Sequence, residues 1–145
     1  MVDIFTEILI NSPLEKVADY AVNPDNASEW YANIKSVEWK SSKPLTLGSK
    51  VAFVAHFLGR KLAYTYEIVV LIPLQKIVMR TAEGPFPMET TYTWAAIDDG
   101  STKMTLRNKG NPTGFSKMVA PFMGVMMRRA NTKDLMNIKK IIEST

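Results

Sequence analysis

Three tyrosines, Tyr64, Tyr66 and Tyr92, are the residues whose type and spacing best suit them to chemistry in this chain. They occupy alternate positions in two segments whose apolar residues repeat with period two. That period is typical of β-strands, so all three side chains are expected on one side of a sheet. A buried tyrosine hydroxyl either bonds to a protein partner or orients the carbonyl or phenol of a ligand. Both interpretations stay open here.

Further side chains share these inward positions. In segment 61–72 the inward face is Leu62, Tyr64, Tyr66, Ile68 and Val70, and the C-terminal segment opposes it with methionines concentrated between residues 118 and 127. An apolar lining with a few hydroxyls and one amide is usual for a small-molecule pocket, although the same pattern also fills a solid core. The predicted ligand-binding residues are Phe53, Phe57, Tyr64, Tyr66, Met79, Thr81, Thr90, Tyr92, Asn108, Met118, Phe122 and Met126.

No residue set for nucleophilic or metal chemistry is evident. His56 is the one histidine, its position favours the outer face, and an inward His56 would instead be a candidate acid or base. Glu67, Glu89, Arg80 and Arg107 also fall on outward positions. We therefore predict no catalytic residues, no metal and no cofactor, and nothing in the sequence requires an enzyme.

These positions depend on an expected order of elements. A first strand and six later ones are predicted, and the six are expected to be antiparallel neighbours because they follow one another in sequence. The expected strands are 2–10, 36–40, 50–58, 61–72, 76–81, 88–97 and 102–109.

The helices are expected in three places. Ser12 can cap a helix with Pro13 at its first position, and a second short helix is expected over 25–31. Apolar residues at steps of three to four predict a long helix over 112–143, with a kink or break near Pro121.

Composition limits the class of protein. The 145 residues, 46% apolar and 22% charged, suit one globular domain spanning residues 1–145. No run approaches the roughly 20 apolar residues that cross a bilayer, so no stable membrane insertion is expected. With no cysteine, and with acidic residues where a signal peptide carries basic ones, we expect a cytoplasmic protein, and we expect a monomer.

Charge is unevenly distributed along the chain. Residues 102–145 hold nine Lys or Arg against two acidic residues, whereas residues 1–101 are net acidic. A basic segment can attract nucleic acid or lipid, or form the solvated side of an amphipathic helix. Aromatic residues do not interleave with these basic residues as on a nucleic-acid stacking surface, so nucleic acid is not an expected partner.

Four local motifs make the interpretation more specific. The first is residues 11–17 together with Trp30, and the second is Gly59 together with residues 66–69, which precede Pro73. The third and fourth are residues 99–105 and residues 134–143. Together with the order of elements, they resemble the START-like (SRPBCC) superfamily, and within it the polyketide cyclase/dehydrase and lipid-transport branch. The resemblance implies an α+β helix-grip fold, in which a curved seven-stranded antiparallel sheet wraps the long C-terminal helix around a cavity.

The resemblance also frames the function. Members bind lipids, sterols, polyketides, plant hormones or quinones, a minority catalyse cyclisation or dehydration, and others activate a chaperone ATPase. No shared catalytic set carries over to this chain. We expect a carrier or sensor of a hydrophobic small molecule such as a lipid, polyketide or flavonoid-like aromatic. The alternatives are a polyketide aromatase/cyclase or dehydratase, and a protein-interaction module of the ATPase-activator type.

Overall fold

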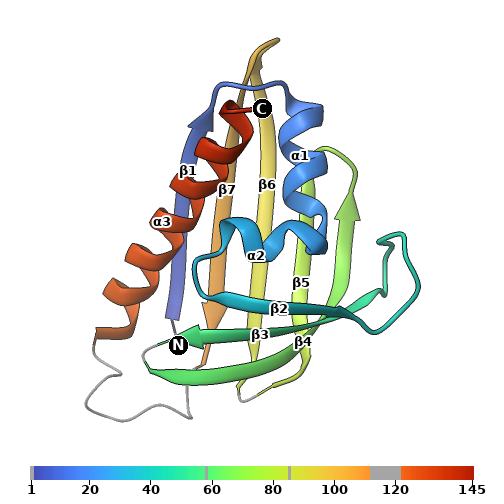
Figure 1. The fold of residues 1–145 in the computed structure, drawn as a ribbon, viewed down its shortest axis with the longest axis vertical. Helices are drawn as coiled ribbons and strands as arrows, with labels where there is room; N and C mark the ends of the chain where they lie inside the picture. The colour runs from blue at the N-terminus through green and yellow to red at the C-terminus, as the bar shows by residue number, and fades with distance from the viewer. Residues whose placement is uncertain (1, 58, 85, 112–121) are drawn as a thin grey trace.

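A computed structural model describes residues 2–57, 59–84, 86–111 and 122–145 as a curled antiparallel sheet with three helices (Figure 1). The strands lie in the order β1-β7-β6-β5-β4-β3-β2, which confirms the predicted helix-grip α+β fold. The strands are β1 (Val2–Ile10), β2 (Ile34–Trp39), β3 (Lys50–Phe57), β4 (Arg60–Ile72), β5 (Lys76–Glu83), β6 (Met88–Asp98) and β7 (Ser101–Gly110). The helices are α1 (Leu14–Val22), α2 (Ala27–Trp30), which follows a 3-10 turn (Pro24–Asn26), and α3 (Met123–Glu143).

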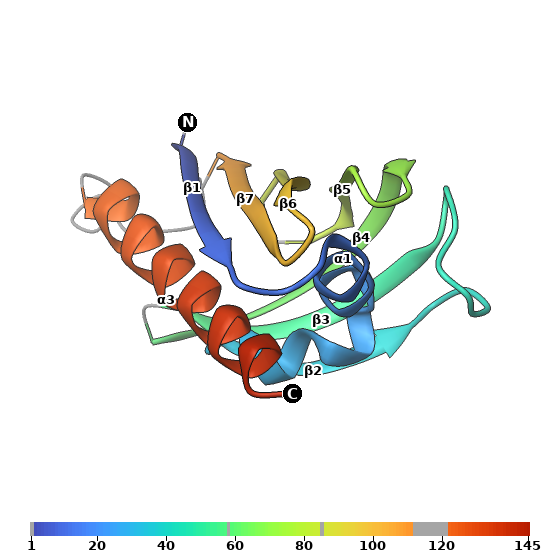
Figure 2. The same ribbon diagram turned by 90° about the horizontal axis from the view of Figure 1, so that it is seen from above.

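The curl of the sheet brings its two ends toward the same side of the molecule. Seen from above, the strands form an open gutter, with α1 and α2 inside the curve and α3 crossing its open side beside β1 (Figure 2). All three helices therefore cover the concave face. None of the described helices is long and apolar enough to cross a membrane.

The start of the first helix differs from the expectation. Pro13 is extended, with ψ at 150°, and α1 begins at Leu14 without a side-chain cap. Ser12 does not cap the helix. It is buried, and its carbonyl oxygen accepts a hydrogen bond of 2.9 Å from the Thr102 hydroxyl. Ser12 thus joins the turn after β1 to the start of β7.

The alternation predicted along the longest strand holds only as far as Ile68. The register between β4 and β5 shifts between Ile68 and Val70, so Leu71 lies opposite the buried Ile77 and packs against the core. Val70 lies opposite Val78 instead. A bulge inserts one residue into the pairing and reverses the faces beyond it, so the prediction that Val70 points inward is wrong.

The long helix is described from Met123 onward, whereas the predicted kink at Pro121 falls outside the described residues. Its C-terminal half is packed solidly, since Leu135, Ile138 and Ile142 are each at most 2% exposed. These residues recur at steps of three and four, as expected for the buried stripe of an amphipathic helix.

Contacts along the side of α3 attach it to the first strand and to the turn that follows. The side chains of Arg128 and Lys139 donate to the carbonyl oxygens of Phe5 (3.1 Å) and Leu9 (2.8 Å). At the end of the helix, the Glu143 carboxylate accepts from the backbone N–H of Asn11 at 2.7 Å. Both ends of the described helix are therefore fixed relative to β1.

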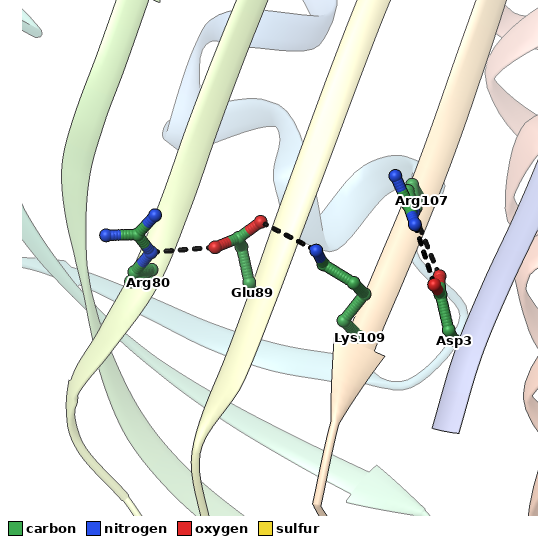
Figure 3. Close-up of polar contacts among 5 residues, drawn as sticks. All are labelled: Asp3, Arg80, Glu89, Arg107 and Lys109. Atoms are coloured by element: carbon green, nitrogen blue, oxygen red, sulfur yellow. Dashed lines mark hydrogen bonds and ion pairs between the residues drawn. The ribbon is translucent and has the colours of Figure 1, made fainter. Parts of the chain in front are cut away.

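The convex face of the sheet carries the charged residues that were predicted to point outward. Arg80, Glu89 and Lys109 form a row across β5, β6 and β7, with ion pairs of 2.7 and 3.7 Å, and Arg107 binds both carboxylate oxygens of Asp3 (Figure 3). The cationic partners hold the pKa values of Glu89 and Asp3 below their usual range. These ion pairs join neighbouring strands on the convex face of the sheet.

Packing of α3 can be tested by deleting part of a buried side chain. Replacing the fully buried Ile138 with alanine is expected to lower the free energy of unfolding by about 2–5 kcal/mol, measured by urea denaturation. The matched control is Ile97→Ala in β6, where the side chain is 58% exposed and the loss should stay below about 1 kcal/mol. Equal losses in the two variants would contradict the described packing.

Candidate ligand-binding site

A cavity of about 150 Å³ lies between the concave face of the sheet and the three helices. Its lining includes side chains from α1, α2, every strand and the N-terminal half of α3. Leu135, Ile138 and Ile142 are absent from that lining, since the C-terminal half of α3 packs directly on the sheet. An engineered cavity of about 150 Å³ in another protein admits a benzene molecule, so this space suits a small organic ligand.

Eight of the twelve residues predicted to bind a ligand line this cavity. They come from five neighbouring strands, β3 to β7, because the curl turns their inward positions toward a common centre. The eight residues are Phe53, Phe57, Tyr64, Tyr66, Met79, Thr90, Tyr92 and Asn108.

Three of the other four residues lie outside the cavity, and the fourth is not among the described residues. Thr81 accepts a hydrogen bond from the backbone N–H of Met88 (3.0 Å) and does not line the cavity, so its hydroxyl ties β5 to the start of β6. Phe122, which directly precedes α3, is 59% exposed, and Met126 in the first turn of α3 is 39% exposed. Met118 falls outside the described residues.

Aromatic rings form one wall of the cavity. Phe53 stacks on Tyr64 with ring centroids 5.7 Å apart, and Tyr64 meets the edge of Tyr66 at 5.1 Å. Trp30 from α2 packs against Tyr31 and Tyr92, with ring centroids 4.2 and 5.6 Å apart, respectively. Such a surface offers ring faces and edges to an apolar ligand.

The tyrosine hydroxyls remain protonated at neutral pH. Burial raises the pKa of Tyr66 to about 12, although its hydrogen bond with Thr90 acts in the opposite direction. Burial also raises the pKa values of Tyr31, Tyr64 and Tyr92, and the hydroxyls of Tyr31 and Tyr92 are hydrogen-bonded to each other. The site therefore presents neutral hydroxyl groups.

A row of polar side chains crosses the cavity from β4 to α3. The Tyr66 hydroxyl lies 2.6 Å from the Thr90 hydroxyl, which donates to Oδ1 of Asn108 at 2.6 Å. Nδ2 of Asn108 then donates to Oδ1 of Asn131 at 3.1 Å. Three strands are thus linked to the helix by side chains at a single level of the cavity.

Asp134 is a buried carboxyl group on the same face of α3. It is 2% exposed, lines the cavity, and accepts a hydrogen bond of 3.0 Å from the backbone N–H of Ala32. Burial raises its pKa to about 7, and the bond from Ala32 and the charge of Lys133 only partly oppose this effect. At neutral pH both the protonated and the ionised form of Asp134 are populated.

Asn131 and Asp134 were not among the predicted site residues, because helical periodicity directs attention to apolar positions. A signal was nevertheless present in the sequence. Both residues lie on the stripe that runs from Met127 to Ile138 at steps of three and four. Polar residues at buried positions of an amphipathic helix indicate a site or a hydrogen-bond network.

The structure also places the residues that were considered for acid–base and metal chemistry. His56 is exposed on β3, as expected from its position in the strand. Among the residues that the structure describes, no group of three or more acidic or histidine side chains is placed to hold a metal ion.

Comparison of the chain with known protein families identifies the family to which it belongs. Residues 1–143 match the family described as polyketide cyclase / dehydrase and lipid transport, so the chain belongs to that family. No curated protein matches the chain in sequence.

Solved structures share the fold at low sequence identity. The protein TTHA0849 from Thermus thermophilus superposes with a TM-score of 0.82 at 16% identity, covering 98% of this chain and 97% of that one. The Zhui aromatase/cyclase from a Streptomyces species also gives 0.82, at 14% identity, covering 97% and 93%. A START superfamily protein from Mycobacterium smegmatis gives 0.80 at 10% identity, covering 98% and 97%. At these identities the likeness extends to the fold alone.

The burial of Asp134 predicts a pH dependence of stability. Its pKa rises from 3.8 to about 7 on folding, so between these values the unfolded chain binds fewer protons than the folded one. The contribution of Asp134 to the free energy of unfolding is therefore fully present at low pH and is lost as pH rises through 7. From about pH 5 to pH 8, the free energy of unfolding should fall by roughly 2–3 kcal/mol more in the wild type than in Asp134→Asn.

Urea denaturation at several pH values measures this difference. Asparagine retains an acceptor for Ala32 but does not titrate, so the variant isolates ionisation of the carboxyl group. Parallel pH profiles for the two proteins would show that Asp134 has an ordinary pKa.

Proposed function

We propose that the protein is a non-catalytic carrier or sensor that binds a hydrophobic small molecule, such as a lipid, polyketide or flavonoid-like aromatic, in this cavity. The observation that carries the proposal is the cavity itself, whose lining is mainly apolar and aromatic with a short row of hydroxyl and amide groups. A few polar groups in an apolar hollow are the usual make-up of a small-molecule site.

Family membership supports the same function, because the family is described in terms of lipid transport as well as polyketide chemistry. Binding would be driven by removal of the ligand's apolar surface from water, worth about 25 cal/mol per Å². The tyrosine and asparagine groups would then set the orientation of the ligand. Nothing in this account requires a covalent step.

An amide NMR titration with fatty acids, sterols, flavonoids, quinones and aromatic polyketides tests the proposal. We expect saturable shifts at Phe53, Tyr64 and Tyr92 with at least one compound. A well-dispersed spectrum that no compound perturbs would contradict the proposal.

A cavity-filling substitution identifies where the ligand sits. Ala55→Phe places a ring in the cavity from β3, where Ala55 is 7% exposed, and should weaken binding of the best compound at least about tenfold. The control is Ala95→Phe, which adds the same ring to an exposed position of β6. Equal affinities of the two variants would place the ligand elsewhere.

A second candidate function, a polyketide aromatase/cyclase or dehydratase, is favoured by one observation, Asp134. A titratable group inside the cavity is what acid–base chemistry on an enolisable ketone needs, and efficiency is greatest when its pKa is close to the working pH. In such a reaction the Asp134 carboxylate would take a proton from the carbon beside the ketone, and the resulting carboxylic acid would give it to the hydroxide that leaves the next carbon, which forms water and restores the carboxylate.

The aldol of benzaldehyde and acetone is a simple probe for this reaction, because its dehydration to benzalacetone is followed by absorbance. For an enzyme, the wild type should accelerate dehydration, and Asp134→Asn should lose at least about a hundredfold of that rate while still binding the product. A carrier would show the same slow rate as buffer in both proteins. The rate of the wild type therefore separates the two candidate functions.

A further inference from the structure

We propose that Asn131 and Tyr66 form a polar subsite that selects a neutral carbonyl compound over both a hydrocarbon and a carboxylate of the same shape. This inference rests on the proposed ligand-binding function and adds the chemical class of the ligand. It follows from the direction of the hydrogen bonds in the row Tyr66–Thr90–Asn108–Asn131 and from the side-chain nitrogen of Asn131, which has no hydrogen-bond partner among the described residues.

The direction of the row is fixed by counting protons. The single hydroxyl proton of Thr90 is donated to Oδ1 of Asn108 at 2.6 Å, so Thr90 can only accept from the Tyr66 hydroxyl, also at 2.6 Å. Donation therefore runs from Tyr66 toward the helix. The oxygen of Tyr66 keeps its acceptor capacity at one end of the row.

At the other end, Asn131 has a donor without a partner. Its Oδ1 accepts from Asn108, whereas Nδ2 has no hydrogen-bond partner among the described residues. Asn131 is only 5% exposed and lines the cavity, so this amide group is enclosed where an unmade hydrogen bond is costly. A ligand oxygen that only accepts, such as the oxygen of a ketone, satisfies it.

The carboxyl group of Asp134 distinguishes between neutral and negatively charged ligand acceptors at Asn131. It lies one helical turn from Asn131 on the same face of α3 and lines the same cavity. The charge of Lys133 acts on Asp134, and the charge of Asp134 in turn raises the pKa values of the neutral tyrosines Tyr31, Tyr64 and Tyr92. A ligand carboxylate at Asn131 would therefore lie one helical turn from the carboxyl group of Asp134, beside tyrosines that carry no positive charge.

The cations nearest to the site are engaged or lie outside it. Lys109 also lines the cavity, but its ammonium group lies 3.7 Å from Glu89 in the charged row on the convex face (Figure 3). Arg129 and Lys133 belong to the outer hollow beside Met126, which shares Asp134 with the cavity. The geometry consequently favours an uncharged acceptor.

Three ligands of matched shape test the inference: acetophenone, its hydrocarbon isostere α-methylstyrene, and benzoate. In amide NMR titrations of the wild type at neutral pH, acetophenone should bind about five- to tenfold more tightly than α-methylstyrene, and benzoate more weakly than either. The side-chain amide signals of Asn131 should shift with acetophenone and not with the hydrocarbon.

Two variants test whether the difference in affinity between acetophenone and α-methylstyrene arises from the amide group of Asn131. Asn131→Leu should remove the preference for acetophenone over α-methylstyrene. Asn137→Leu is the control, because it deletes an amide of the same helix that bonds to the Trp30 carbonyl oxygen and does not line the cavity. The ligand comparison uses the wild type, so it remains decisive even where a variant does not fold.

The outcomes separate the two proposals. If none of the three compounds, nor any member of the larger panel, binds, the proposed function fails and this inference fails with it. If acetophenone and α-methylstyrene bind equally, or if benzoate binds most tightly, the carbonyl subsite is overturned while ligand binding stands.

Discussion

The packing of α3 against the curled sheet is the constraint on which the rest of the structure depends. Leu135, Ile138 and Ile142 fill the space at one end, so the helix is held there at core density. Toward its N-terminus the same helix presents Met127, Ala130 and Asn131 to a hollow. The C-terminal half of α3 packs directly on the sheet, and the cavity lies beside its N-terminal half.

The sequence was sufficient to predict the sheet and most of the strand lining, because alternation along a strand is a strong signal wherever one face is buried. It failed at Val70, where a bulge reverses the alternation and no glycine or proline marks the position. It also did not predict the exposure of Phe122, which precedes α3, or of Met126, two apolar residues that were expected to face the ligand. Exposed apolar residues near the start of a helix cannot be distinguished by periodicity from buried ones when the place where the helix leaves the sheet is unknown.

The uneven distribution of charge along the chain leads to ion pairs between the acidic strand β1 and the basic strand β7. The acidic residues Asp3 and Glu7 on β1 lie beside Arg107 and Lys103 on β7, with ion pairs of 2.7 and 3.0 Å. Exposed pairs of this kind add little stability, but they are consistent with the register of β1 against β7. Part of the basic character of residues 102–145 is therefore used in ion pairs within the fold.

The contacts from Arg128 and Lys139 have a consequence for association with other chains. β1 ends the sheet, and an unpaired strand at the end of a sheet invites a strand from another molecule to add to it. The carbonyl oxygens of Phe5 and Leu9 already accept hydrogen bonds from these two basic side chains. The helix that bounds the cavity therefore also occupies two backbone acceptors that a strand added to β1 would compete for.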